Sequence, residues 1–518
     1  MIFDKRPYLT TRTLFWLFAP LLVGAPAYAI AAHGFVTQTN YPSMFYMGQL
    51  HILITKITVC STTRVPETSE MSFNSLTGNL SYTPDLFAPR FQSISDVEVP
   101  CDGLHLEVGS QVHVTGKLEQ MKTVVADHIS AYMEVMNQSF AGSAVAEEQS
   151  DSDKSISVSK HSLWIDGYPM IITPQTSLHF SSENAKPKYY LSRKYGTVGI
   201  HTIFTPHGKQ HLTEFTFRPD SRVQYGATFN SSECMVATEI TAWPNFIDTK
   251  ERKYLNAFAA EVLPPDYGNQ TSGKIYFPHI FKVGIFVSIV PSMPVQKWVS
   301  NVGRKAIPGY WLNTTGSGQG NIRFRFFVIK KSKYTDVLSR ITHNDESKDV
   351  DDSGIIALPN GNILIPTAFL VHLKNSSQLA FLLSSAVASV IQQHAYLFAS
   401  FNIQEAIRST IKATMLMQEQ QSLRLGIRQM YLAGYDIREA PYAWAVAQGK
   451  PVNNPVIDSK DPDKEIPWYA AYAFDYISKY YRDVDYSKLK RGEREYQQFL
   501  QELRKADPEA FAPPPPRK

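Results

Sequence analysis

The stretch that decides the fold runs from residue 378 to residue 394 and reads Gln-Leu-Ala-Phe-Leu-Leu-Ser-Ser-Ala-Val-Ala-Ser-Val-Ile-Gln-Gln-His. Its apolar residues recur at i, i+3, i+4, i+7, i+8, i+11 and i+12, which is the spacing of one face of an α-helix. These residues are Leu379, Leu382, Leu383, Ala386, Val387, Val390 and Ile391. The pattern predicts a helix with a continuous buried face, around which the neighbouring segments must pack.

Shorter elements are expected on both sides of this helix. Apolar residues at helical spacing between 295 and 302 predict an amphipathic helix that ends near Gly303, and residues 322–329 alternate as a strand. Residues 355–366 predict a β-hairpin, because Asn360-Gly361 supplies the left-handed conformations of a tight turn. Further on, residues 421–426 read Gln-Ser-Leu-Arg-Leu-Gly, and residues 433–441 read Ala-Gly-Tyr-Asp-Ile-Arg-Glu-Ala-Pro.

This ordered set resembles the zinc metallopeptidase family of HtpX-like heat-shock proteases and CAAX prenyl proteases. In that family a hairpin reading Ala-Leu-Pro-Gly-Gly precedes a helix that carries His-Glu-x-x-His. A later helix reads Glu-Ala-Asp-x-x-Gly and is followed by Ala-Gly-Tyr-Asp-Pro. Here residues 357–361 read Ala-Leu-Pro-Asn-Gly. The likeness covers residues 293–450, about a third of the chain, and implies a mainly helical metallopeptidase-like domain.

The same resemblance implies that the metal chemistry is missing. In the family, two histidines four residues apart bind Zn²⁺ together with a downstream glutamate, and the glutamate between the histidines is the catalytic base. Carried over position by position, these four roles fall on Ser385, Ala386, Ser389 and Gln421. Neutral Ser and Gln are poor zinc ligands and Ala has no proton acceptor, so we expect no catalytic residue, no metal and no cofactor here.

For the other candidate sites in the sequence, a structural role is favoured over a functional one. His207 and His211 have a metal-ligand spacing but lie in a predicted hairpin without a glutamate, where they do not share a helix face. His394 and His372 are expected to be packed or capping histidines. Residues 316–320 lack the Lys-Ser/Thr of a phosphate loop, and residues 344–352 lack the central Gly and final Glu of a calcium-binding EF-hand loop.

The amino-terminal half has the period of β-structure. Strands are expected at residues 49–55, 111–115 and 123–126, with a turn at 116–119, and a second set has landmarks at 163–168, 171–176, 196–201 and 212–219. Short strands with Gly and Pro between them suggest small barrels or sandwiches resembling oligonucleotide/oligosaccharide-binding (OB) folds. The predicted fold class is therefore α+β, with two small β-rich, OB-like units before the mainly helical domain.

These patterns divide the chain into six predicted parts. They are a signal peptide (1–29), a β-rich module (30–146), a polar linker (147–159), a second β-rich module (160–290), a peptidase-like domain (291–460) and a helical tail with a Pro-rich end (461–518). In the tail, the tyrosine-dense segment from 468 to 481 favours packing on the domain core over presenting a surface to a partner.

Composition excludes several classes of protein. Charged residues make up 19% of the 518 residues, and Lys+Arg 51 against Asp+Glu 47 leaves a formal charge of +4 with no basic cluster. Such a chain is neither a disordered polyelectrolyte nor a typical nucleic-acid-binding protein. Three cysteines are too few for a disulfide scaffold or a cysteine-held zinc module.

The first 29 residues predict export. Lys5, Arg6 and Arg12 precede an apolar run of about 12 residues from Leu14 to Ala25, followed by Ala-Tyr-Ala at 27–29. The run is too short to span a bilayer as a helix, which favours a cleaved signal peptide over an uncleaved anchor. A periplasmic or secreted location permits a disulfide between Cys60 and Cys101 and leaves Cys234 unpaired.

These observations favour an exported, non-catalytic pseudo-metallopeptidase that acts as a scaffold and binds a polypeptide or a cell-envelope component. A second hypothesis is an active zinc metalloendopeptidase with ligands that the pattern does not reveal. A third gives the β-rich modules a carbohydrate or cell-wall binding role. We expect no nucleic acid and no membrane span in the mature chain, and the sequence leaves the oligomeric state open.

Overall fold

The computed structural model describes most of the chain between Tyr28 and Ala512. The described ranges are 28–64, 72–74, 79–81, 96–133, 139–147, 162–171, 175–180, 201–212, 222–229, 235–243, 256–258, 261–263, 274–277, 285–312, 322–330, 354–394, 408–449, 456–457 and 468–512, apart from residues 105, 107, 109, 121, 206, 207, 257 and 393. The expectations for residues 1–27, 148–159, 316–320, 344–352 and 513–516, and for Cys234 and His207, lie outside them.

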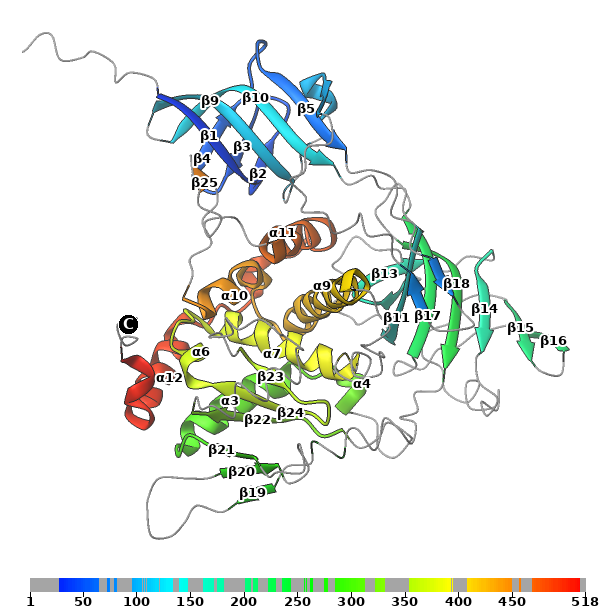
Figure 1. Cartoon of the computed structure of the whole chain (residues 1–518), viewed down its shortest axis with the longest axis vertical. Helices are drawn as coiled ribbons and strands as arrows, with labels where there is room; N and C mark the ends of the chain where they lie inside the picture. The colour runs from blue at the N-terminus through cyan, green and yellow to red at the C-terminus, as the bar shows by residue number, and fades with distance from the viewer. Residues whose placement is uncertain are drawn as a thin grey trace, which may run out of the picture.

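The chain is a mixed α and β structure with several sheets (Figure 1). The first sheet has the order β2-β3-β4-β10-β9-β1-β25, with β5 beside β10 and β8 beside β5. Its strands are β1 (Tyr28–Phe35), β2 (Gln38–Asn40), β3 (Met44–Met47), β4 (Leu50–Leu53), β5 (Val59–Arg64), β8 (Asp96–Val99), β9 (Gln111–Gln120), β10 (Thr123–Met133) and β25 (Val456–Ile457). Their inward residues, such as Phe45, Ile52, Val114 and Ile129, form one apolar core.

The prediction of a turn at residues 116–119 is wrong. Strand β9 continues without a break through Gly116 to Gln120 and pairs with β10 on the far side of residues 121 and 122. Gly116 is needed for a different reason, because a Cβ at this position would overlap the Val125 carbonyl oxygen on β10. This glycine therefore permits a close approach between two strands and does not end one.

The second sheet closes part of itself into a ring. Its order is β13-β12-β11-β17-β18-β14-β15-β16, and an additional pairing joins β13 to β18. The strands are β11 (Ser139–Glu147), β12 (Ser162–Ile165), β13 (Tyr168–Ile171), β14 (Ser177–Phe180), β15 (His201–Thr205), β16 (Gly208–Leu212), β17 (Arg222–Phe229) and β18 (Met235–Trp243). Strand β11 lies in this sheet, so the change from the first sheet to the second falls between Met133 and Ser139. A separate hairpin pairs β6 (Ser72–Asn74) with β7 (Asn79–Ser81).

The carboxyl-terminal half surrounds a short mixed sheet of the order β22-β24-β23. These strands are β22 (Arg325–Ile329), β23 (Ile356–Ala357) and β24 (Asn362–Pro366), and Gly361 has the positive φ (88°) that the hairpin turn requires. A bridge from Ile289 to Ile329 joins them to β19 (Glu261–Leu263), β20 (Lys274–Phe277) and β21 (Ile285–Ser288). Apolar residues of both sheets share one core.

Helices pack on the other face of this mixed sheet (Figure 1), and two of them, α3 and α7, form where the apolar periodicity predicts. They are α3 (Met293–Lys305), α4 (Gly309–Leu312), α6 (Thr367–Leu370), α7 (Ser376–Ile391), α9 (Arg408–Leu432), α10 (Ala440–Ala447), α11 (Trp468–Tyr480) and α12 (Glu493–Ala506). Asn375 caps α7 by accepting a hydrogen bond from the Gln378 backbone N–H at 2.9 Å. No helix in the described ranges is both long enough and apolar enough to cross a membrane.

The final segment of the chain packs into the helical core. On α12, Tyr496, Phe499 and Leu503 are buried, and the Phe499 ring stacks on Trp298 of α3 at 4.3 Å between centroids. The carboxylate of Asp507 accepts a hydrogen bond from the Thr367 hydroxyl at 2.8 Å at the end of β24. The described residues from 468 to 512 are thus part of the same apolar core as α3 and α7.

Helix α11 connects the three parts of the molecule. Its Phe474 ring lies 4.5 Å from Phe35 of β1, and its Ser478 hydroxyl donates to the Val108 carbonyl at 2.6 Å, so it contacts the first sheet unit. Its Tyr476 hydroxyl donates to the Gly167 carbonyl in the second sheet unit. Because α11 also packs on α9 and α10, its tyrosine-dense sequence serves internal packing.

The β12–β13 hairpin inserts its turn against α9 and α11. Asp166 (φ 58°) and Gly167 (φ 76°) form a left-handed turn, and a Cβ on Gly167 would lie 2.8 Å from the Arg424 Cβ. Arg424 Nη2 lies 2.7 Å from Asp166 Oδ2, and Arg424 Nε donates to the Asp166 carbonyl at 2.8 Å. Both side chains are less than a tenth exposed, so this ion pair is buried.

Tyrosines complete the shell around this buried pair. The Tyr225 hydroxyl donates to Asp166 Oδ2 at 2.7 Å, and Arg424 Nη1 donates to the Tyr472 hydroxyl at 2.6 Å. The Arg424 guanidinium also lies 4.5 Å from the centroid of the Tyr168 ring. Burial raises the pKa of Tyr168 and Tyr225 well above the ordinary value, so both hydroxyls keep their protons and remain donors at neutral pH.

We predict that Arg424→Met lowers the free energy of unfolding by about 3–5 kcal/mol, because it leaves the Asp166 carboxylate buried without its cation. The double variant Asp166→Asn/Arg424→Met should recover part of this loss. Urea unfolding followed by tryptophan fluorescence measures both. Arg482→Met is the matched control, since Arg482 is 66% exposed and 4.0 Å from Asp483, and it should change stability by less than about 1 kcal/mol. Equal effects at 424 and 482 would contradict a structural role for the buried pair.

Candidate functional site

Helices α7 and α9 meet where the family resemblance places the metal. Gly426 of α9 faces Ser385 of α7, and a Cβ on Gly426 would overlap Ser385 Oγ and would lie 3.1 Å from its backbone nitrogen. Ser385 is 4% exposed, and its hydroxyl makes no hydrogen bond to any described residue. Ala386, 8% exposed, belongs to the apolar core. Direct helix–helix packing therefore occupies this part of the interface.

One helical turn further along, four polar side chains form a connected group. We call Ser389, His394, Gln421 and Ser422 the serine–histidine cluster. His394 Nε2 lies 2.6 Å from Gln421 Oε1, Ser422 Oγ lies 3.2 Å from His394 Nδ1, and Ser389 Oγ lies 2.8 Å from Ser422 Oγ. Because an amide oxygen only accepts, Nε2 carries the imidazole proton, and Nδ1 accepts the Ser422 proton. Ser389 then donates to Ser422 Oγ.

Burial decides the charge state of this cluster. It lowers the pKa of His394 to about 4, although the hydrogen bond to Gln421 acts in the opposite direction. At neutral pH the imidazole is uncharged, and every member of the cluster is a neutral donor or acceptor. The arrangement satisfies buried polar groups, and its imidazole is a weak proton acceptor.

The four positions do not fit a zinc ion. Two serines, an alanine and a glutamine provide no charged or imidazole ligand, and His394 bonds through both ring nitrogens to Gln421 and Ser422. In the part of the chain that the structure describes, no group of three or more His, Cys, Asp or Glu side chains is placed to hold a metal ion. The contact between Ser385 and Gly426 fills space that a first ligand would need.

The structure places the predicted positions and the other candidate residues in four separate parts of the fold. Ser389 and Gln421 enter the cluster, whereas Ser385 and Ala386 pack one turn away on α7. His372 lies in the turn after α6, where its ring would contact a Cβ on Gly449 at 3.5 Å. His211 lies in β16. The sequence alone did not predict a role for Ser422. Two features could have indicated one: Ser422 is next to Gln421, and Ser389 is the only polar residue in the facing stretch 386–391.

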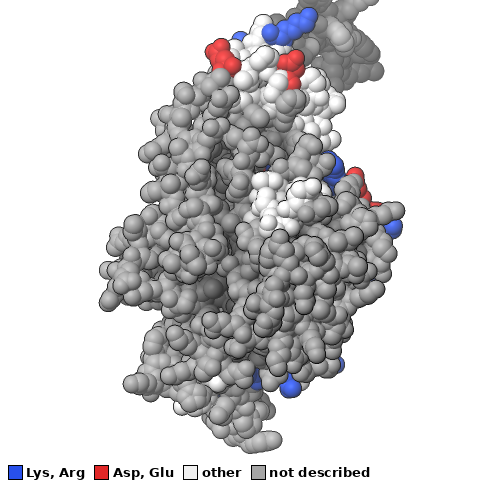
Figure 2. Space-filling view, turned by 90° about the vertical axis from the view of Figure 1, so that its right-hand side faces the viewer, with Lys and Arg blue, Asp and Glu red and all other residues white. Residues whose placement is uncertain are grey.

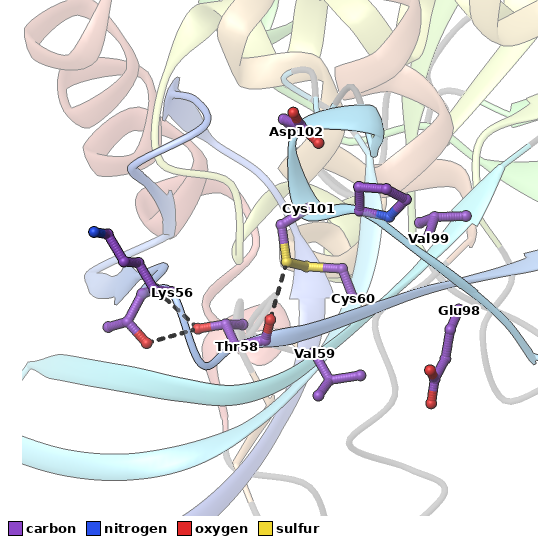
Figure 3. A pocket seen from close by; sticks show the side chains of 10 residues that line it. Lys56, Thr58, Val59, Cys60, Glu98, Val99, Cys101 and Asp102 are labelled. Carbon is purple, nitrogen blue, oxygen red and sulfur yellow. Dashed lines mark hydrogen bonds between the residues drawn. A yellow bond between two sulfur atoms is a disulfide. The ribbon is translucent and has the colours of Figure 1, made fainter.

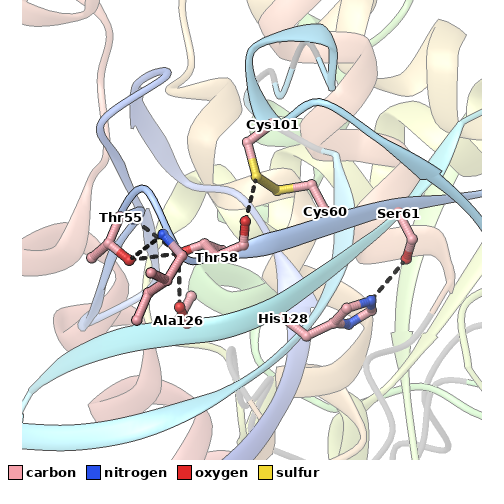
Figure 4. Close-up of a disulfide and its surroundings, with 8 residues drawn as sticks. Thr55, Thr58, Cys60, Ser61, Cys101, Ala126 and His128 are labelled. Atoms are coloured by element: carbon pink, nitrogen blue, oxygen red, sulfur yellow. Dashed lines mark hydrogen bonds between the residues drawn. A yellow bond between two sulfur atoms is a disulfide. The ribbon is translucent and has the colours of Figure 1, made fainter.

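A second feature of interest lies in the first sheet unit, where a disulfide joins Cys60 of β5 to Cys101 (Figure 4). Cys101 begins the short 3-10 helix η2 (Cys101–Gly103) after β8, and its sulfur lies 3.3 Å from the Thr58 carbonyl oxygen. The Thr58 hydroxyl donates to the Ala126 carbonyl of β10 at 2.8 Å. The disulfide therefore fixes the end of β8 to β5, which pairs with β10.

Beside the disulfide the surface is hollowed by a pocket of about 750 Å³ (Figure 3). Its walls come from the turn before β5, from β5 itself, from β8 and from η2. The lining residues are Thr55, Lys56, Thr58, Val59, Cys60, Glu98, Val99, Pro100, Cys101 and Asp102. Among the described residues, this pocket is far larger than the space of about 10 Å³ between α7 and α9.

No protein-family model matches this sequence, and no curated protein matches it. The resemblance to the metallopeptidases therefore depends on the quoted motifs and their spacing.

We predict that Gly426→Ala destabilises the chain by about 1–2 kcal/mol, because the added methyl has no room between the backbones of α7 and α9. Urea unfolding measures the effect. Ser385→Ala/Gly426→Ala should recover part of the loss, since it removes the overlapping hydroxyl. Gly309→Ala is the control, as nothing lies within 4 Å of its added Cβ. A neutral Gly426→Ala would mean that the two helices do not pack this closely.

The buried histidine also predicts a pH dependence. Because the pKa of His394 falls from 6.5 to about 4 on folding, the unfolded chain binds more protons between these values, and stability falls as the pH drops through this window. We expect the titration of His394 alone to lower the free energy of unfolding by about 2 kcal/mol between pH 7 and pH 5. Urea midpoints at the two pH values should therefore differ less in His394→Gln than in the natural chain. The same difference in both proteins would show that His394 titrates normally.

Proposed function

We propose that this chain is an exported, non-catalytic scaffold protein, in which a pseudo-metallopeptidase domain holds two β-rich modules and the assembly binds a polypeptide. The observation that carries the proposal is the α7–α9 interface. At the four positions that correspond to the family's metal site there are helix packing and neutral hydrogen bonds, and the residues have no hydrolytic chemistry to offer.

The arrangement of the modules supports a scaffold. The buried Asp166–Arg424 pair and the contacts of α11 fix both β-rich units to the helices. A protein of this kind presents its surfaces in a constant relative orientation, which lowers the entropic cost of binding a partner that touches more than one unit. We also propose that the ring β13-β12-β11-β17-β18 is an OB-like barrel, because its five strands pair in a closed circle.

The proposal predicts that purified full-length protein contains no stoichiometric zinc and does not cleave casein, but binds it. Elemental analysis measures the zinc content. Gel analysis with and without a chelator tests for cleavage, and the anisotropy of fluorescein-labelled casein measures binding. Bound zinc in stoichiometric amount, or cleavage that a chelator stops, would establish the rival active peptidase. No binding of unfolded polypeptide would remove the scaffold role.

A matched variant tests the assignment of the four positions. Ser385→His/Ala386→Glu/Ser389→His/Gln421→Glu restores the residue types of the family's site. Zinc bound by this variant and not by the natural chain would attribute the missing metal to these positions.

A further inference from the structure

The pocket beside the disulfide carries three charged side chains that form no ion pair within the described part of the chain. Lys56, Glu98 and Asp102 are all exposed, and none of them forms an ion pair with a described residue. Figure 3 shows them on three sides of the Cys60–Cys101 disulfide. Two carboxylates against one ammonium give the pocket an acidic excess. On the face drawn in Figure 2, charges of both signs lie at the end of the molecule that the first sheet forms.

Two aliphatic side chains stand exposed at the same place. Ile57 is 79% exposed and Val59 is 42% exposed, and both belong to the turn and strand that form one wall of the pocket. Only two other large apolar side chains in the described ranges, Phe286 and Met293, are comparably exposed. Exposed aliphatic groups beside charged ones offer a partner both apolar and ionic contacts.

The backbone beside the pocket suits an extended chain. Among the described strands, β8 pairs with β5 alone, through Cys60–Val99 to Thr63–Asp96. A strand with one paired edge can add a peptide through main-chain hydrogen bonds. The disulfide holds β8 in this position, because it ties Cys101, two residues after the strand, to Cys60 of β5.

We infer that this pocket binds an extended polypeptide segment in which a basic side chain is flanked by aliphatic ones. Glu98, which lies on the same face of the β5–β8 pair as Val59, pairs with the basic group. Asp102, on the other side of the disulfide, adds to the negative charge, and the aliphatic groups cover Ile57 and Val59. This inference rests on the proposed polypeptide-binding function and assigns that binding to one surface, on the first sheet unit and away from the α7–α9 interface.

The test uses two fluorescein-labelled peptides of alternating valine and a charged residue, one with lysine and one with glutamate, and anisotropy titration of the full-length protein. We expect the lysine peptide to bind, more weakly as salt is added, and the glutamate peptide to bind much less. The double variant Glu98→Gln/Asp102→Asn should lower the affinity for the lysine peptide about fivefold, as expected for the loss of two exposed charge pairs. Ile57→Ser should weaken it as well.

A variant that is expected to increase the affinity distinguishes a specific role of the pocket charges from general misfolding. Lys56→Gln removes the one cation of the pocket, so it should strengthen binding of the lysine peptide, whereas a merely misfolded pocket would weaken it. Glu509→Gln is the matched control, because this exposed carboxylate lies on the far carboxyl-terminal segment and should change nothing. Equal affinity for the two peptides, or unchanged affinity in the Glu98/Asp102 and Ile57 variants, would overturn the inference.

The casein experiment distinguishes this inference from the function on which it rests. If casein binds the natural chain and the pocket variants equally, polypeptide binding stands and the pocket is the wrong surface. If neither casein nor the lysine peptide binds the natural chain, both proposals fail together.

Discussion

The buried ion pair between Asp166 and Arg424 is the constraint on which the arrangement of this protein depends. Removing two charges from water is costly, and hydrogen bonds to the pair offset part of this cost. Tyr225, Tyr472 and the backbone of Asp166 supply those bonds. Because the carboxylate comes from a β-hairpin and the guanidinium from α9, the shell can form only when the second sheet unit is seated on the helices.

The position of α11 follows from this seating. With the hairpin turn fixed against α9, the Gly167 carbonyl faces the Tyr476 hydroxyl, and α11 packs in the remaining space. The opposite side of α11 then meets Phe35 and the Val108 carbonyl of the first sheet unit. A helix rich in tyrosine suits this place, because each ring buries apolar area while its hydroxyl reaches a polar partner. The three parts consequently share one set of contacts.

The α7–α9 interface is held by close packing and by neutral hydrogen bonds. Small residues at Ser385 and Gly426 bring the helices close, and the serine–histidine cluster satisfies the polar atoms in the next turn. Packing and neutral hydrogen bonds thus occupy the positions at which the resembled family has its metal ligands. This is the physical basis for the non-catalytic function that we propose.

The sequence by itself determined the local elements of the carboxyl-terminal half. The apolar stripe of α7, the Asn360-Gly361 turn and the amphipathic segment of α3 were predictable, because each is set by periodicity or by backbone conformations that only a few residues adopt. From the family resemblance it also led to the expectation that Ser385, Ala386, Ser389 and Gln421 bind no zinc. The turn at Gly116 was predicted wrongly, since a glycine that ends a strand and one that admits a neighbouring backbone look alike in sequence.

Only the tertiary structure decided which of these elements meet. Asp166 and Arg424 are 258 residues apart, and Ser422 meets His394 from a different helix, so no local pattern could pair them. The pocket beside Cys60 and Cys101 likewise needs two strands that are distant in the chain. Periodicity reports which side of an element is buried, whereas the partner on that side is fixed by the packing of the whole chain.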